Sequence, residues 1–215
     1  MKDTLISVKE SLTFGWETFK KDPWFYVGVT AALTIFSMIV SALTSGGEGF
    51  ASFVGFVISY LASTVVTIAY MRLALSAAQG TPVGWDGLWA PEHYVNMLGT
   101  TILQSVIVVI GLVLLIVPGI IAAILLSLSQ LAVVDKKLHP IDALKESYRL
   151  TRPHVWPLFV FMLALLLLNI AGLLALVIGL LVTMPVSLIA TAHVYKKLVQ
   201  GEAPAVMTPP ATPAQ

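Results

Sequence analysis

The sequence of 215 residues contains no cysteine, and only 11% of its residues are charged. Without cysteine the chain forms no disulfide bond, offers no thiolate nucleophile and holds no metal ion through sulfur. In soluble domains about a quarter of the residues are charged. The low charge, together with 58% hydrophobic residues, therefore indicates that most of the chain lies in lipid.

Long apolar runs separate the charged residues of the chain. A helix of about 20 apolar residues crosses a hydrocarbon core of about 30 Å, and each run is close to that length. The sequence therefore predicts an all-α, polytopic membrane protein with one membrane domain over residues 1–202. Its six expected spans are residues 24–43, 50–71, 95–117, 119–134, 156–175 and 177–194.

The basic residues all fall on one side when the chain is threaded through these six spans. Cytoplasmic loops of membrane proteins are enriched in Lys and Arg. We therefore expect both termini in the cytoplasm and a multi-pass location in the bacterial cytoplasmic membrane. Only Glu48 is expected to carry charge on the outer side, in a short turn over residues 44–49.

Segments that precede the spans combine polar residues with an apolar face. Residues 4–21 are expected to form an amphipathic helix in the cytoplasmic interface. The helix that begins at Pro140 places Ile141, Leu144 and Tyr148 on one face. The apolar stripe of the first helix consists of Leu5, Val8, Leu12, Trp16 and Phe19.

The chain is organised as three units, each with an interfacial segment followed by a hairpin of two spans. The middle unit begins with the aromatic segment 82–91. A threefold repeat explains this plan, although any hairpin membrane protein needs basic and helix-breaking residues at such places. Residues 203–215, rich in Pro and Ala, predict a disordered tail.

The second half of the chain contains a turn, a helix and a closing motif in a characteristic order. These are Pro118-Gly-Ile-Ile121, Asp135, Ala143-Leu-Lys-Glu-Ser147, Pro185 and Tyr195-Lys-Lys-Leu198. With this set, residues 100–200 resemble the glycerophosphoryl diester phosphodiesterase membrane-domain family, and are similar also to the YciC-like family of integral membrane proteins. In the proteins that give the first family its name, the membrane part accompanies a separate hydrolytic domain. The resemblance therefore implies a membrane module without inherited catalytic residues.

Small residues recur at every fourth position of the second span. They are Gly55, Ser59, Ser63 and Thr67. Helices in lipid pack closely along such rows, so helix packing is one interpretation. The alternative is that the three hydroxyl groups line a polar path for a solute.

Three amide side chains lie in or near the spans: Gln104, Gln130 and Asn169. An unpaired polar group in lipid is costly, so each amide needs a partner or water. They either join helices or line a central cavity. His193, near the end of the last span, is either a proton-responsive group or an interface residue.

A cluster of basic residues follows the fourth span: Lys136, Lys137, Lys145, Arg149 and Arg152. Arginine offers a planar fork that matches phosphate oxygens, and each base near anionic lipid contributes about 1 kcal/mol. The cluster therefore predicts an anionic headgroup site. The same charges are also explained as a topology signal, or as a surface for a membrane-protein partner or a second copy of the chain.

The predicted spans lack charged residues at depth, and pumps or intramembrane hydrolases usually need at least one. The histidines show no metal-ligand spacing, so we expect no metal, cofactor or nucleic-acid partner. The favoured interpretation is a non-enzymatic membrane module that engages anionic lipid headgroups or a membrane-protein partner. The alternative is a small-solute transporter or channel. A lipid-modifying enzyme would depend on three interfacial acids, Asp86, Glu92 and Asp135.

Overall fold

The computed structural model describes the whole chain except residues 1–5, 45–49, 82–83, 89–90, 176–177 and 203–215. The predicted tail and outer turn thus lie largely or wholly outside the described residues. The described part is all-helical, which confirms the predicted class. Its elements are α1 (Val8–Lys21), α2 (Pro23–Thr44), α3 (Phe50–Gln79), η1 (Trp85–Leu88), η2 (Pro91–His93), α4 (Tyr94–Leu114), α5 (Ile116–Leu125), α6 (Ser129–Lys136), α7 (Pro140–Thr151), η3 (Arg152–His154), α8 (Val155–Leu174) and α9 (Ile178–Glu202).

Several helical segments of the described part are long and apolar enough to cross a membrane. They are Pro23–Thr44, Phe50–Gln79, Pro91–Leu114, Ile116–Lys136 and Pro140–Leu174. These five segments support a helical, multi-pass membrane protein. Of the sixth expected span, 177–194, residues 178–194 fall within α9, which is not among these segments, so the number six stays a prediction.

Three pairs of helices form hairpins: α2 with α3, α4 with α5, and α8 with α9. Glycines allow the partner helices to approach closely near the closed ends. A Cβ atom added to Gly111 would lie 2.9 Å from the Cα atom of Gly119, and one added to Gly179 would lie 2.3 Å from the carbonyl oxygen of Gly172. Such close contacts drive helix association in lipid. The hairpins agree with the expected plan, while the threefold repeat stays a prediction.

The second hairpin turns earlier than the sequence predicts. Leu115 is extended, with φ −164° and ψ 141°, and reverses the chain between α4 and α5. Pro118, which was expected in the turn, lies in the first turn of α5. Proline is tolerated there because the first N–H groups of a helix have no partner within the helix.

The predicted span 119–134 is not one continuous helix. α5 ends at Leu125 and α6 begins at Ser129, with a turn between them. The hydroxyl of Ser147 on α7 accepts a hydrogen bond from the N–H of Leu128 at 3.2 Å and donates to the carbonyl of Leu125 at 2.8 Å. Thr151 donates to the same carbonyl at 2.8 Å. α7 thus satisfies the backbone groups that the break releases, which is the condition for non-helical backbone at membrane depth.

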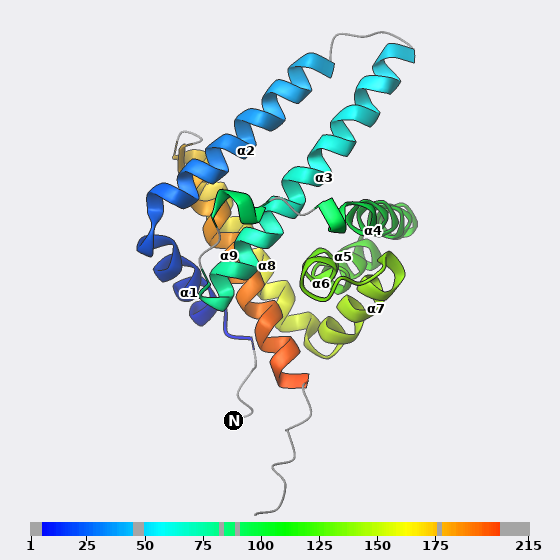
Figure 1. The fold of residues 1–215 in the computed structure, drawn as a ribbon. Coiled ribbons are helices and arrows are strands. Elements are labelled where there is room, and N and C mark those ends of the chain that lie inside the picture. Colours follow the sequence, from blue (N-terminus) through cyan, green and yellow to red (C-terminus); the bar gives the residue numbers. More distant parts are fainter. Residues whose placement is uncertain (1–5, 45–49, 82–83, 89–90, 176–177, 203–215) are drawn as a thin grey trace, which may run out of the picture.

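The buried core lies at one end of the molecule, where α3, α6, α7, α8 and α9 meet. The side chains of Leu128, Leu150, Leu158 and Tyr195 are at most 1% exposed. The α2–α3 hairpin instead projects away from the other helices (Figure 1) and exposes its apolar side chains, with Phe50 at 80%. An exposed apolar surface of this kind suits contact with lipid.

α1 packs on α9 through small residues. A Cβ atom added to Gly15 would lie 2.7 Å from the carbonyl oxygen of Val186, and Ser11 and Thr18 are also buried on α1. Of the predicted apolar stripe, Phe19 is buried whereas Trp16 is 47% exposed. The closest contact between α1 and α9 therefore involves small side chains, and the Trp16 side chain points away from this contact to the surface.

Candidate functional site

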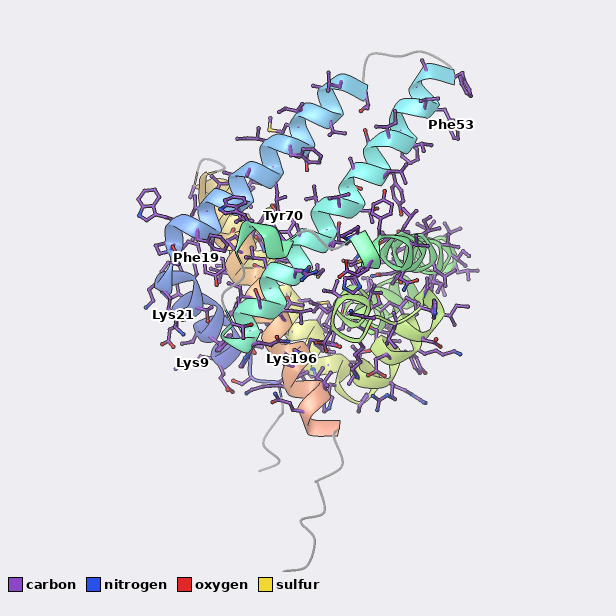
Figure 2. The ribbon with its side chains drawn as sticks, in the orientation of Figure 1. Lys9, Phe19, Lys21, Phe53, Tyr70 and Lys196 are labelled. Atoms are coloured by element: carbon purple, nitrogen blue, oxygen red, sulfur yellow. The ribbon has the colours of Figure 1, made fainter. Side chains whose placement is uncertain are left out.

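Basic side chains gather at the end of the molecule where the core lies. We call this the basic end, and define it by Lys9, Arg72, Lys136, Lys145 and Lys196 of α1, α3, α6, α7 and α9. Figure 2 shows Lys9 and Lys196 at this end, whereas Phe53 lies at the far tip of the α2–α3 hairpin. The positions agree with a single charged face beside the apolar spans.

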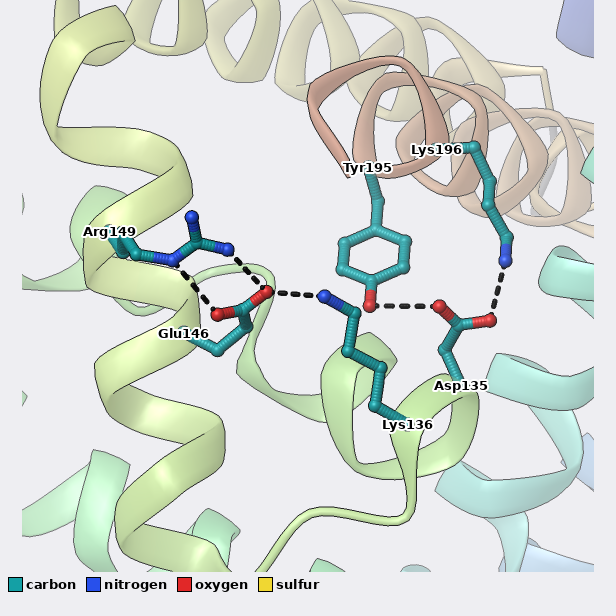
Figure 3. Close-up of polar contacts among 6 residues, drawn as sticks. All are labelled: Asp135, Lys136, Glu146, Arg149, Tyr195 and Lys196. Atoms are coloured by element: carbon teal, nitrogen blue, oxygen red, sulfur yellow. Dashed lines mark hydrogen bonds and ion pairs between the residues drawn. The ribbon is translucent and has the colours of Figure 1, made fainter. Parts of the chain in front are cut away.

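Two bases of the predicted cluster are occupied by an internal acid. Glu146 on α7 accepts hydrogen bonds from Lys136 and Arg149, and its side chain is only 14% exposed (Figure 3). The second oxygen of Glu146 accepts from the Nε of Arg149 at 3.1 Å. The fork of Arg149 and the ammonium of Lys136 thus share one carboxylate, which offsets one of their two positive charges.

A second acid joins α6 to α9. Asp135 accepts a hydrogen bond from the hydroxyl of Tyr195 at 3.1 Å and pairs with the ammonium of Lys196 (Figure 3). The side chains of Asp135 and Lys196 are 15% and 20% exposed. Asp135, a candidate acid for catalysis, is therefore already engaged on both carboxylate oxygens.

The other exposed bases of this region lie on and just after α7, in a row that we call the α7 stripe: Ile141, Lys145, Tyr148, Arg152 and Trp156. Steps of three or four residues place the first four along one face of α7 and its C-cap, and Trp156 follows at the start of α8, beyond the turn η3; all five side chains are exposed. The guanidinium of Arg152 lies 5.6 Å from the centre of the Tyr148 ring. Within the described residues, neither Lys145 nor Arg152 forms an ion pair with an acid. Leu144, expected on the same face, is buried instead.

A polar cavity of about 320 Å³ lies between α3, η2 and α6. The NH1 atom of Arg72 lies 3.6 Å from Oε1 of Glu92, and Nε2 of His93 lies 3.7 Å from the same oxygen. The cavity is lined by Arg72, Leu75, Ser76, Gln79, Thr81, Glu92, His93, Val134, Asp135 and Lys137. Two of the three candidate acids therefore meet here, while the side chain of Asp86 lies outside the described part.

The sequence did not point to Arg72 or His93 as site residues. Each stands alone beside an apolar run, and only the fold brings the ends of α3, η2 and α6 together. The one local signal for this site in the sequence is that an acid, Glu92, directly precedes His93.

The small-residue row of α3 contacts α2 near the hairpin tip. A Cβ atom added to Gly55 would lie 2.3 Å from the carbonyl oxygen of Thr44, and the Ser59 hydroxyl lies 2.6 Å from the Thr44 hydroxyl. The hydroxyls of Ser63 and Thr67 donate to carbonyls of their own helix. These contacts place the first half of the row in helix packing.

The predicted amides lie in different helix pairs. The Oε1 atom of Gln104 accepts a hydrogen bond from Ser129 at 2.9 Å, between α4 and α6. Asn169 donates to the Ser187 hydroxyl at 2.9 Å, between α8 and α9. Gln130 is half-buried on α6. Gln104 and Asn169 thus join separate helix pairs, and neither lines the cavity described above.

α1 is tied to the end of α9 by an ion pair and a ring contact. Lys197 donates to Glu10, and the Phe14 and His193 rings stack with centroids 4.0 Å apart. The hydrogen bond from Lys197, and then its charge, hold the pKa of the Glu10 carboxyl below its ordinary value. This pair lies next to the Gly15 contact, so it helps to hold α1 on α9.

Acid should loosen α1 from α9. Because the pKa of Glu10 is lowered in the folded state, its contribution to stability is present above the pKa of an unfolded glutamate and is lost as the pH falls through the folded value. The protection factors of the α1 amides, which correct for the slower intrinsic exchange in acid, should therefore fall at acid pH in the wild type. In Glu10→Gln the protection factors should be lower already at neutral pH, with a smaller further decrease on acidification. An identical pH profile in the two proteins would contradict this role.

Among the described residues, no group of three or more His, Asp or Glu side chains is placed to hold a metal ion.

No family model matches the chain, and no solved structure matches it. The chain is 25% identical over 154 residues to the uncharacterized protein Rv2560 of Mycobacterium tuberculosis (strain H37Rv) and to the uncharacterized protein Mb2590 of Mycobacterium bovis, covering 72% of this chain and 47% of each relative. The chain thus spans about half the length of the curated relatives that it matches.

Proposed function

We propose that this protein is a non-enzymatic membrane module that engages anionic lipid headgroups through the α7 stripe. The single observation that carries the proposal is that Lys145 and Arg152 alternate with Ile141, Tyr148 and Trp156 along one exposed stretch of chain. Aromatic rings prefer the depth of the headgroups, and basic residues are attracted to anionic lipid. Both preferences are met when this face lies on the membrane surface.

The position of the α7 stripe supports lipid over a protein partner. The stripe lies in the polar, N-terminal part of Pro140–Leu174, a segment of spanning length, and precedes the apolar part of α8, so the proposal places it where that segment enters the apolar layer. Two bases near an anionic surface contribute about 2 kcal/mol in total. Lys136 and Arg149 add less, because Glu146 offsets their charge.

The proposal includes the cytoplasmic membrane and cytoplasmic termini, which follow from the one-sided distribution of basic residues. A transporter or channel has less support, because Ser59, Gln104 and Asn169, which would line its path, bond within separate helix pairs.

Lys145→Ala/Arg152→Ala should weaken retention of phosphatidylglycerol about tenfold or more, since two surface bases are lost. The measurement is native mass spectrometry of the protein released from its own membrane. Lys9→Ala/Lys21→Ala is the matched control, because it removes the same charge from exposed positions on α1. The proposal fails if the two double variants retain the lipid to the same extent.

A further inference from the structure

The cavity between α3, η2 and α6 is lined by two bases and two acids, and one of the acids is already paired. Arg72 and Lys137 bring two cations, and Glu92 brings one acid whose carboxylate is not taken up elsewhere. The other acid, Asp135, is already bonded to Tyr195 and Lys196. The available charge of the cavity therefore favours an anion.

Glu92 stands between the two donors without bonding fully to either. Its Oε1 atom lies 3.6 Å from Arg72 and 3.7 Å from His93, and both distances exceed those of a hydrogen bond. The Glu92 side chain is 52% exposed, so it is free to move aside. A carboxylate oxygen thus occupies the place where an oxygen of a stronger anion would accept from both residues.

His93 is buried without a hydrogen bond. Its side chain is 5% exposed and lines the cavity, yet it forms no hydrogen bond within the described part of the chain. Its Nε2 atom lies 3.7 Å from Oε1 of Glu92 at the cavity, and an anion bound there would accept a hydrogen bond from the ring.

Lys137 has an unusual backbone conformation at the edge of the cavity. It ends α6 with φ 53° and ψ 35°, a left-handed conformation that glycine adopts far more readily. Outside glycine, it is the one residue with positive φ in the described chain. Strained positions of this kind cluster at functional sites. Here Lys137, with a long cationic side chain, occupies a position where glycine would suit the backbone better.

We propose that this cavity binds a phosphate ester, with Arg72 and Lys137 as cationic ligands and His93 as a neutral donor. Phosphate offers several strong acceptor oxygens, so it can accept from all three side chains at once, which a carboxylate cannot do as well. The volume of about 320 Å³ is at the lower end of ligand pockets and accommodates a headgroup. The site is distinct from the α7 stripe and does not depend on it.

Either a lipid headgroup or a soluble phosphate ester would present this chemistry. Arg72 and Lys137 each follow an apolar segment, and a base that follows a membrane span suits contact with lipid phosphates. Three probes separate the sources: short-chain phosphatidylglycerol, the diacylglycerol with the same chains, and glycerol 3-phosphate. Binding to the full chain in neutral detergent is measured by isothermal titration calorimetry.

Phosphatidylglycerol should bind more tightly than the diacylglycerol, and Arg72→Gln and Lys137→Gly should each weaken that binding about tenfold to a hundredfold. Lys137→Gly is the decisive variant, because glycine relieves the left-handed conformation while removing the cation. Its melting temperature should equal or exceed that of the wild type, so lost binding cannot be ascribed to misfolding. Lys9→Ala/Lys21→Ala, which removes two exposed bases of α1, is the control, and it should bind all three probes as the wild type does. Lys145→Ala/Arg152→Ala should keep the wild-type affinity for glycerol 3-phosphate, because the α7 stripe is a separate site.

Binding of both phosphate probes supports a general phosphate site, and binding of phosphatidylglycerol alone supports a lipid site. Two results overturn the inference: equal affinity for phosphatidylglycerol and the diacylglycerol, or unchanged affinity in Lys137→Gly. If only Lys145→Ala/Arg152→Ala loses binding, the cavity site is wrong and the α7 stripe holds the lipid. The two proposals thus fail on different variants.

Discussion

The double substitution Ser147→Ala/Thr151→Val should lower the free energy of unfolding by about 4 kcal/mol, because it strips two backbone groups of their partners. The N–H of Leu128 would lose Ser147, and the carbonyl of Leu125 would lose both hydroxyls. Ser147→Ala alone should cost about 2 kcal/mol, since Thr151 still serves the carbonyl.

The expected effect exceeds that of an ordinary contact between helices in lipid. A hydrogen bond between side chains of two membrane helices contributes about 0.6 kcal/mol, because the groups find other partners when it is lost. The groups at the break between α5 and α6 are backbone groups in a turn. Leu128 is 1% exposed, and Ser147 and Thr151 are fully buried, so water does not replace the hydroxyls.

Unfolding in mixed detergent and dodecyl sulfate micelles, followed by far-ultraviolet circular dichroism, measures this effect. Ser127→Ala is the matched control, because its hydroxyl donates only to the nearby carbonyl of Ile124. It should cost less than about 0.5 kcal/mol. If the Ser147 and Ser127 variants unfold alike, α7 does not support the break.

The sequence predicts the apolar helices and the hairpins well because long runs and helix-breaking residues are local signals. Residues 24–43, for example, lie within α2 at Pro23–Thr44. The position of the second turn was harder to predict, because proline breaks the interior of a helix but fits its first turn, where Pro118 lies. The same residue therefore permits two positions of the turn.

The break after Leu125 could not be predicted. Residues 126–128 contain neither glycine nor proline, and their neighbours continue the apolar run. What stabilises the break is a pair of hydroxyls about 20 residues later, on a helix that meets it only in the folded protein. Tertiary contacts here override the local preference for one helix.

The basic cluster was predicted as a set, and the fold divides it. The contact of Glu146 with Arg149 follows from their spacing on one helix, but its contact with Lys136 depends on how α6 and α7 pack. Lys137 joins a different site again, together with Arg72 from α3. Charge patterns in the sequence therefore located the face, while pairing decides which bases are available on it.

Asp135→Ala should lower the free energy of unfolding by about 3 kcal/mol, because it leaves the Lys196 ammonium mostly buried without its acid. The loss of the Tyr195 hydrogen bond adds to the effect. Full burial would make the cost larger, but Asp135 and Lys196 are 15% and 20% exposed, so water compensates in part. The same unfolding measurement applies. Asp142→Ala removes an exposed acid of α7 that has no ion pair within the described residues, and should cost less than about 0.5 kcal/mol.

Adding Lys196→Met to Asp135→Ala should recover most of the lost stability, since the cost arises from an unpaired charge and not from the absence of a pair. The recovery would mean that Asp135 serves to join α6 to α9. A chemical role predicts otherwise: a carboxylate held for catalysis is not needed for folding, so Asp135→Ala would then be as stable as the wild type. The cycle therefore decides whether this acid of the cavity is structural, and leaves Glu92 as the acid there that a ligand can displace.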